Sequence, residues 1–221
     1  MSHWFSRACL HARPRDSELL RRLSNYQEAY RDHTLVWRLF PGDDIPRDFV
    51  FRRDNLNGTT IYYIVSRRAP KDVDRLFQVQ SKPYLPRVTA GTHLHFDLRA
   101  NPTISRRNEN GVSRRHDVLM DAKRLVTEPQ MISAAMERAG HEWIGERAPR
   151  WGLEIEQGSV LQTGYRQHRL TSKSRRIEFS SLDFRGVANV TDPDLLQHAL
   201  LEGVGHARGF GCGLLLVKRV E

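Results

Sequence analysis

Apolar positions in the first half of the chain recur at two spacings, one typical of helices and one typical of strands. Between residues 17 and 40, large side chains repeat every three or four positions, at Leu19, Leu20, Leu23, Tyr26, Tyr30, His33 and Trp37. This spacing predicts helix, interrupted near Asn25 into two pieces. Strands are expected at residues 5–10, 48–53, 60–65 and 93–99, with Asn57-Gly58 as a hairpin turn, and a short helix at residues 72–77.

The second half repeats this order after a polar interruption. Residues 101–115 contain Pro, Gly, Asn and several arginines with little to bury, so we expect a linker there. Beyond it, a helix is expected at residues 129–139 and another at residues 192–201, capped by Thr191 or Asp192. Strands are expected at residues 117–120, 151–155, 159–169, 176–184 and 214–220.

The elements therefore follow a βαββαβ order twice. We predict an α+β fold of two tandem ferredoxin-like (RRM-like) domains, residues 1–104 and residues 105–221. The first would carry the helix with Tyr30 and His33, and the second a basic hairpin and a glycine-rich loop. A single larger α+β domain is the alternative.

The net charge of the chain indicates what kind of molecule it binds. The net charge is +9, and Arg supplies 30 of the 35 basic residues. Because the guanidinium group binds phosphate in a bidentate manner and stacks on bases, this bias favours a nucleic-acid partner; a GC-rich genome would be the neutral explanation. No apolar run is long enough for a membrane span or a secretory signal, so we expect a cytoplasmic protein that does not contact membranes. Cys9 and Cys212 read as buried thiols.

A glycine-rich segment near the C-terminus is the strongest local signal. Five glycines lie within eleven residues, at Gly203, Gly205, Gly209, Gly211 and Gly213. Such a loop can turn its amide groups towards an anion, although a plain flexible turn explains the glycines equally well. His206 and Arg208 inside the segment favour contact with RNA phosphate. The spacing fits neither a Walker loop nor a dinucleotide-binding fingerprint.

Tyr30 and His33 form the second signal. At positions i and i+3 of a helix they share one face. Histidine can give or take a proton near neutral pH, which suits cleavage of RNA by attack of its own 2′-hydroxyl. Aromatic and histidine residues on helices are more often core or surface residues, so the pattern alone leaves both interpretations open.

Other candidates carry weaker signals. Lys173, Arg175 and Arg176 lie between two expected strands and would form a basic hairpin tip suited to a duplex backbone, or a solvated loop. His93 and His95 share one strand face, but no Cys or carboxylate cluster completes a metal site. We therefore expect neither a metal nor a cofactor.

Four segments, taken in order along the chain, match the motifs of a known family. They are Tyr30-Arg31-Asp32-His33 with the following Trp37-Arg38-Leu39-Phe40-Pro41, then Arg47-Asp48-Phe49-Val50-Phe51, Phe96-Asp97-Leu98-Arg99-Ala100-Asn101-Pro102, and the glycines at 203, 205, 211 and 213. Together they resemble the CasE/Cse family of CRISPR-associated endoribonucleases. The resemblance spans nearly the whole chain. One position departs from it, because Asp97 places an acid where the family often has a base, which argues against phosphate contact from that strand.

The resemblance implies two ferredoxin-like domains and metal-independent cleavage at the 3′ base of a CRISPR repeat hairpin, leaving a cyclic phosphate. It assigns general acid/base work to His33 and positioning to Tyr30, with or without a share in proton transfer; Tyr26 would take this role if the register were shifted. It places RNA contacts at Lys173, Arg175, Arg176, Gly203, Gly205, His206, Arg208, Gly211 and Gly213. The implied partners are repeat hairpin RNA and the other Cascade subunits, with a monomer when free. A non-catalytic subunit that holds guide RNA is the main alternative, and a metal-dependent nuclease is a weaker one.

Overall fold

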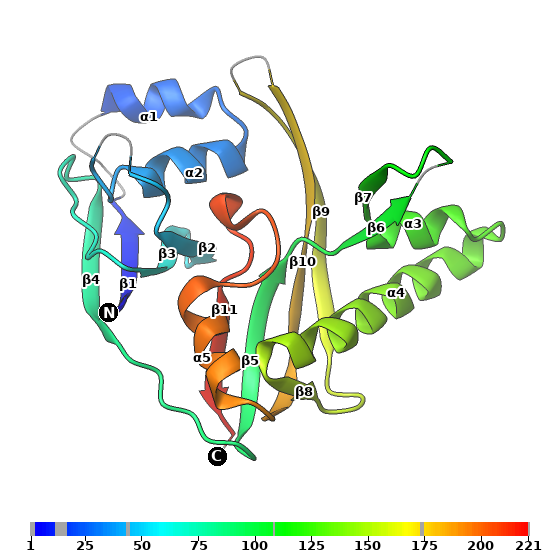
Figure 1. Ribbon diagram of the computed structural model, residues 1–221. Helices are drawn as coiled ribbons and strands as arrows, with labels where there is room; N and C mark the ends of the chain where they lie inside the picture. The colour runs from blue at the N-terminus through cyan, green and yellow to red at the C-terminus, as the bar shows by residue number, and fades with distance from the viewer. Residues whose placement is uncertain (1–2, 12–16, 43–44, 108, 173–174, 221) are drawn as a thin grey trace.

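The computed structural model describes residues 3–11, 17–42, 45–107, 109–172 and 175–220, and it contains two antiparallel sheets that contact each other (Figure 1). The first sheet has the order β2-β3-β1-β4. Its strands are β1 (His3–Leu10), β2 (Phe49–Leu56), β3 (Thr59–Ser66) and β4 (Phe77–Tyr84). Helices α1 (Ser17–Ser24) and α2 (Glu28–Trp37) join β1 to β2 and cover one face (Figure 1).

The second sheet has the order β11-β5-β10-β8, and β9 pairs with β10. Its strands are β5 (His93–Ala100), β8 (Leu153–Ile155), β9 (Leu161–Ser172), β10 (Arg175–Val190) and β11 (Leu215–Arg219). The helices of this half are α3 (Val118–Arg124), α4 (Ile132–Arg147) and α5 (Pro193–Glu202), with 3₁₀ turns η1 (Pro129–Met131), η2 (Ala148–Trp151) and η3 (Arg208–Phe210). In both sheets the first strand lies at the centre beside a later antiparallel strand, so the predicted pair of ferredoxin-like domains is confirmed.

Several local predictions are confirmed with their physical cause. The helical stretch breaks between Ser24 and Glu28, as the position of Asn25 indicates. Asn57 and Gly58 have φ values of 51° and 78°, which is the left-handed conformation that a two-residue hairpin between β2 and β3 requires. Asp192 caps α5, because its carboxylate accepts hydrogen bonds from the amides of Asp194 and Leu195.

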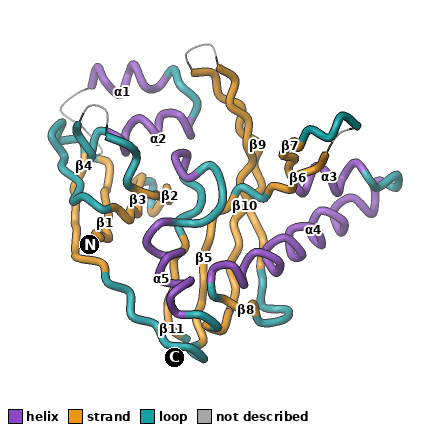
Figure 2. Tube along the Cα trace, viewed as in Figure 1, coloured by secondary structure: helices purple, strands orange, loops and turns teal. Residues whose placement is uncertain are grey.

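Three predictions of local structure are wrong. The expected linker instead contains a two-stranded ribbon of β6 (Thr103–Arg107) and β7 (Ser113–Asp117), which projects beside α3 (Figure 2). The expected strand at residues 117–120 is the start of α3, because the Asp117 carboxylate accepts from the Met120 amide and caps a helix there. Residues 72–77 are not helical, because the Asp72 carboxylate accepts from the amides of Leu76 and Phe77 and holds a turn before β4.

The position of β5 bears on the domain boundary. β5 lies inside the range expected for the first domain, yet it pairs with β10 and β11 of the second sheet. The division at residues 104 and 105 would separate β5 from its own sheet. We therefore propose that the boundary lies between Tyr84 and His93, which end β4 and begin β5.

Other expectations concern the thiols and membranes. Cys212 is buried as expected, and burial raises the pKa of its thiol to about 12, whereas Cys9 is only half-buried. Among the described residues, no helix combines the length and the apolar character needed to cross a bilayer.

The two halves meet through apolar and charged side chains. Val50 and Val65 of the first sheet pack with Leu214, which precedes β11. Beside them, the side chain of Arg52 is only 2% exposed and bonds to Asp97 of β5 and to Asp54. Asp97 also accepts from Arg185 of β10, at 2.9 Å. A buried guanidinium needs a counter-charge, and Asp97 supplies it to Arg52 across the contact between the two halves. This role agrees with the prediction that Asp97 does not bind phosphate.

Removing this counter-charge should destabilise the protein. We expect Asp97→Ala to lower the free energy of unfolding by about 3 kcal/mol, the lower end of the range for a buried charge that loses its partner, because Asp54 still contacts Arg52. Urea denaturation measures the change. Glu18→Ala is the control, since its pair with Arg22 is exposed and should contribute less than about 0.5 kcal/mol. Equal effects of the two substitutions would contradict this role of Asp97.

Candidate active site

Helix α2 presents Tyr30 and His33 on one face, as the spacing predicts. The opposite face of α2 is fixed in the first domain by four buried residues, Ala29, Asp32, Leu35 and Val36. Asp32 accepts a buried hydrogen bond from the Tyr62 hydroxyl of β3, at 2.6 Å. With α2 held in this way, His33 is half-buried and directed towards the second domain.

A hydrogen bond between the two domains determines the state of His33. Its Nδ1 atom lies 2.7 Å from the carbonyl oxygen of Gly209 in the glycine-rich loop. A carbonyl oxygen can only accept, so Nδ1 carries the proton and the neutral ring leaves its lone pair on Nε2. His33 is thereby held in the tautomer that can take a proton at Nε2, and in its cationic form it can give one.

The space beside Gly209 is occupied by the side chains of Arg47 and His33. A Cβ at residue 209 would lie 2.9 Å from Nη1 of Arg47 and 3.6 Å from Nδ1 of His33. A side chain there would require the end of the Arg47 side chain to move, whereas its distance to the imidazole is an ordinary van der Waals contact. Neither Gly209 nor Arg47 was among the site residues expected from the sequence. Gly209 was marked only by the surrounding glycines, and Arg47 only as the first residue of a family-like segment.

Burial is the main influence on the pKa of His33. Removal of the ring from water lowers this pKa, and the nearby charge of Arg47 lowers it further, while the Gly209 carbonyl raises it. The net direction is downward. His33 is therefore neutral over more of the physiological pH range than a solvent-exposed histidine, and Nε2 is available as a base.

Aromatic rings from three segments form a continuous series through His33. Adjacent rings in the series have centroids between 4.4 Å and 6.0 Å apart, and they are those of Tyr26, Tyr30, His33, Phe210, Phe179 and His168. Phe210 stacks on the imidazole of His33 at 5.0 Å and belongs to the same loop as Gly209. No pattern in the sequence marks Phe179 or His168, because they join this series only when β9 and β10 pair.

The same series separates the two candidate tyrosines. The ring of Tyr30 lies 6.0 Å from that of His33, whereas Tyr26 contacts Tyr30 and is 47% exposed. Tyr30 is therefore the tyrosine placed beside the imidazole. The catalytic role of either residue stays a prediction.

The glycine-rich loop is a packed structure. Gly203 and Gly213 lie where a Cβ would meet Val50 at 2.8 Å and the Val204 carbonyl oxygen at 2.2 Å. The amides of Val204 and Gly213 donate within the protein, to the carbonyls of Gly213 and Arg99. These contacts explain both glycines without an anion. Gly205 has open space around it and Gly211 is buried, so RNA contact by any of these four glycines stays a prediction.

The polar side chains expected to bind RNA lie within this loop and on the β9–β10 hairpin. Arg208 donates to the carbonyl of Glu202 at 2.8 Å, and His206 lies 3.3 Å from Arg115 of β7. The pairing of β9 with β10 confirms the predicted hairpin, which passes the end of α2 in Figure 2. Lys173 and the side chain of Arg175 lie outside the described residues. Arg176 is exposed and contacts Glu178 at 2.6 Å.

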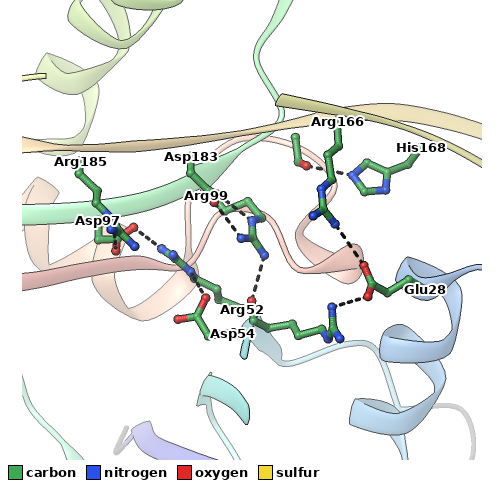
Figure 3. Close-up of polar contacts among 11 residues, drawn as sticks. Glu28, Arg52, Asp54, Asp97, Arg99, Arg166, His168, Asp183 and Arg185 are labelled. Atoms are coloured by element: carbon green, nitrogen blue, oxygen red, sulfur yellow. Dashed lines mark hydrogen bonds and ion pairs between the residues drawn. The ribbon is translucent and has the colours of Figure 1, made fainter. Parts of the chain in front are cut away.

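A cavity of about 230 Å³ lies between α2 and the second sheet. Its walls include Asp32, Arg53, Arg99, His168 and Phe210. Figure 3 shows the charged network around it, in which each arginine is directed at a carboxylate or a carbonyl.

Arg99 is the centre of this network, because it holds Asp183 in a bidentate pair and also donates to the Arg53 carbonyl. Across the cavity, Glu28 of α2 pairs with Arg53 and with Arg166 of β9. The network therefore fixes α2 relative to the second domain.

His93 and His95, considered above as a metal pair, lie exposed on β5. Within the described ranges, no three His, Cys, Asp or Glu side chains are grouped so that they could hold a metal ion.

Comparison with known proteins agrees with the resemblance in the sequence. The sequence model of a family described as CRISPR associated protein matches residues 3–219. The chain is 24% identical over 194 residues to the CRISPR system Cascade subunit CasE of Escherichia coli (strain K12), which covers 86% of this chain and 91% of that protein. It is 25% identical over 146 residues to the CRISPR-associated endoribonuclease Cse3 of Thermus thermophilus, which covers 62% of this chain and 60% of that protein.

A solved structure of Thermus thermophilus Cse3, bound to an RNA representing a pre-cleavage complex, has the same fold. The match has a TM-score of 0.70 at 21% identity and covers 99% of this chain and all of that chain. The fold predicted from the pattern of helices and strands is therefore the fold of Cse3, which belongs to the family that the sequence resembles.

The buried carboxyl of Asp32 generates a prediction about stability and pH. Burial raises its pKa to about 6, so between about pH 4 and pH 6 the folded protein holds a proton that the unfolded chain releases. The contribution of Asp32 to stability is therefore greatest at acid pH and is lost as the pH rises through 6. We expect the stability of Asp32→Asn relative to wild type to rise over this range by up to about 3 kcal/mol and then level off.

Urea denaturation at several pH values measures this difference. Asp121→Asn is the control of opposite sign, because Arg106 holds the pKa of Asp121 below its usual range and its contribution is lost as the pH falls. A relative stability of Asp32→Asn that stays constant across the range would refute the raised pKa.

Proposed function

The chain belongs to the family of CRISPR-associated proteins, and on that premise we propose that it is an endoribonuclease that binds and cleaves the repeat hairpin of precursor CRISPR RNA. One relative is named as a Cascade subunit and another as an endoribonuclease. The excess of arginine supports an RNA substrate, because phosphate contacts dominate binding to A-form hairpins. Under this proposal the protein acts in the cytoplasm, keeps its product and assembles with the other Cascade subunits.

The reaction we propose is attack of a 2′-hydroxyl on the adjacent phosphate at the 3′ base of the hairpin. The 2′-oxygen loses a proton and bonds to phosphorus, and the bond from phosphorus to the 5′-oxygen breaks as that oxygen gains a proton. The products are a 2′,3′-cyclic phosphate and a 5′-hydroxyl. An imidazole with a positioned tyrosine can carry out both proton transfers, which supports a mechanism that needs no metal.

The single observation that carries this proposal is the hydrogen bond from Nδ1 of His33 to the Gly209 carbonyl. It leaves Nε2 as the free nitrogen of a ring whose pKa is lowered by burial. Tyr30, beside the ring, is proposed to orient the RNA at this nitrogen. The basic β9–β10 hairpin, with Lys173, Arg175 and Arg176, is proposed to hold the duplex stem. His206 and Arg208, with the glycines at 203, 205, 211 and 213, are proposed to lie along the RNA backbone.

Substitution of His33 tests the reaction separately from binding. With a labelled repeat hairpin in excess EDTA, we expect wild type to cut at one site. His33→Ala should bind with similar affinity but cut at least about 100-fold more slowly, since general acid/base catalysis contributes that much. Tyr30→Phe should slow cleavage less than His33→Ala, and Tyr26→Phe, its matched control, should leave the rate near wild type.

The outcomes distinguish the candidate functions. If wild type binds the hairpin tightly in EDTA and with added Mg²⁺ but never cuts it, the protein is a subunit that holds guide RNA. Cleavage that requires Mg²⁺ would instead identify a metal-dependent nuclease and contradict the proposed mechanism.

Salt dependence tests the arginine-rich RNA surface. If about six phosphates are contacted, the logarithm of the association constant should fall against the logarithm of salt concentration with a slope of about −5. Arg176→Gln should reduce that slope by about one, whereas Arg150→Gln, an exposed control in η2 beside β8, should not. A flat salt profile of wild type would exclude this mode of binding.

A further inference from the structure

Arg47 is a half-buried guanidinium with no counter-charge in the described part of the chain. It lies just before β2, and none of the described residues forms a hydrogen bond or an ion pair with it. Five other arginines that are at least partly buried have a carboxylate partner: Arg38 with Asp74, Arg52 with Asp97, Arg53 with Glu28, Arg68 with Asp48, and Arg99 with Asp183. Because desolvating a charge without a partner is costly, the lack of a described partner at Arg47 needs an explanation.

The surroundings of Arg47 add positive charge. Burial lowers the pKa of Arg47, and the neighbouring cation Arg208 lowers it further. Arg208 donates to the neutral carbonyl of Glu202, and no described carboxylate pairs with it either. Two guanidinium groups therefore lie near each other, which is unfavourable in the free protein and would be relieved by a bound anion.

The same position is adjacent to His33. Nη1 of Arg47 and Nδ1 of His33 both lie within 4 Å of the point that a Cβ of Gly209 would occupy, at 2.9 Å and 3.6 Å. Arg47 is close enough for its charge to lower the pKa of the imidazole. A group held by Arg47 would consequently be within reach of the face of α2 that carries His33 and Tyr30.

We propose that Arg47, assisted by Arg208, binds the phosphate that is cleaved and stabilises the extra negative charge of its transition state. This inference rests on the proposed function. A phosphodiester carries one negative charge, and a second develops on its oxygens as the 2′-oxygen bonds to phosphorus and before the 5′-oxygen departs. A guanidinium placed beside those oxygens stabilises the transition state more than the substrate, which is the requirement for catalysis. Arg47 would then be a catalytic residue that transfers no proton.

Arg47→Gln should separate this role from a structural one. We expect cleavage at saturating enzyme to slow by about 100-fold or more. Affinity for a hairpin with a 2′-deoxy substitution at the cleavage site, which cannot react, should fall less than about tenfold, as for the loss of one phosphate contact. Arg47→Lys should recover part of the rate. The melting temperature of Arg47→Gln should be unchanged or higher, because a crowded cation is removed. The matched control Arg150→Gln should behave as wild type in all three measurements.

A rate for Arg47→Gln within about threefold of wild type would overturn the proposal, since loss of a transition-state contact costs far more. A lower melting temperature with an equal loss of binding and cleavage would also overturn it, because both would show a structural residue.

A second measurement keeps the test independent of cleavage. In wild type, titration with inorganic phosphate should shift the NMR signals of the His33 ring and of the Arg47 side chain and raise the pKa of His33. In Arg47→Gln the response of His33 should be lost. If wild type cleaves no repeat hairpin, the proposed function fails while this titration still decides the anion site; no response up to tens of millimolar phosphate would refute the site itself.

Discussion

The hydrogen bond between His33 and Gly209 is the contact on which the account of this protein depends. It joins residues 176 positions apart in the chain, and each belongs to a different sheet domain. Helix α2 can present the imidazole only because Asp32 and its apolar neighbours hold that helix on the first sheet. The glycine-rich loop can present its carbonyl only because Gly203 and Gly213 let it pack closely. The candidate active site is therefore a property of the contact between domains.

The charged network explains how that contact is maintained in so basic a protein. Arg52 pairs with Asp97 of the other domain, and Arg99 pairs with Asp183 and donates to the Arg53 carbonyl across the contact, as Figure 3 shows. These arginines fix the relative position of the sheets. Arg47 and Arg208 lie near each other beside His33, and neither forms an ion pair with a carboxylate among the described residues. Arg47 and Arg208 therefore differ from Arg52 and Arg99, whose charges are paired with carboxylates.

The sequence allowed the repeated βαββαβ order, the helix break near Asn25, the Asn57-Gly58 turn and the cap of α5 to be predicted, because each depends on neighbouring residues. It also placed Tyr30 and His33 on one helix face. It did not reveal Gly209, Arg47, Phe210 or Phe179 as parts of the site, since their significance arises from tertiary contacts. The ribbon at residues 103–117 was not predicted, because its arginines are typical of a solvent-exposed linker. The backbone of these residues instead pairs across the two strands.

The most direct test of the central claim is the protonation state of His33 in the free protein. Nitrogen-15 NMR of the imidazole distinguishes its two neutral tautomers and follows the titration of the ring. The account predicts a neutral ring that carries its proton on Nδ1, with a pKa below the ordinary value of 6.5. A ring protonated on Nε2 at neutral pH, or one that titrates above 6.5, would show that the Gly209 carbonyl does not set the state of His33 and would contradict the account.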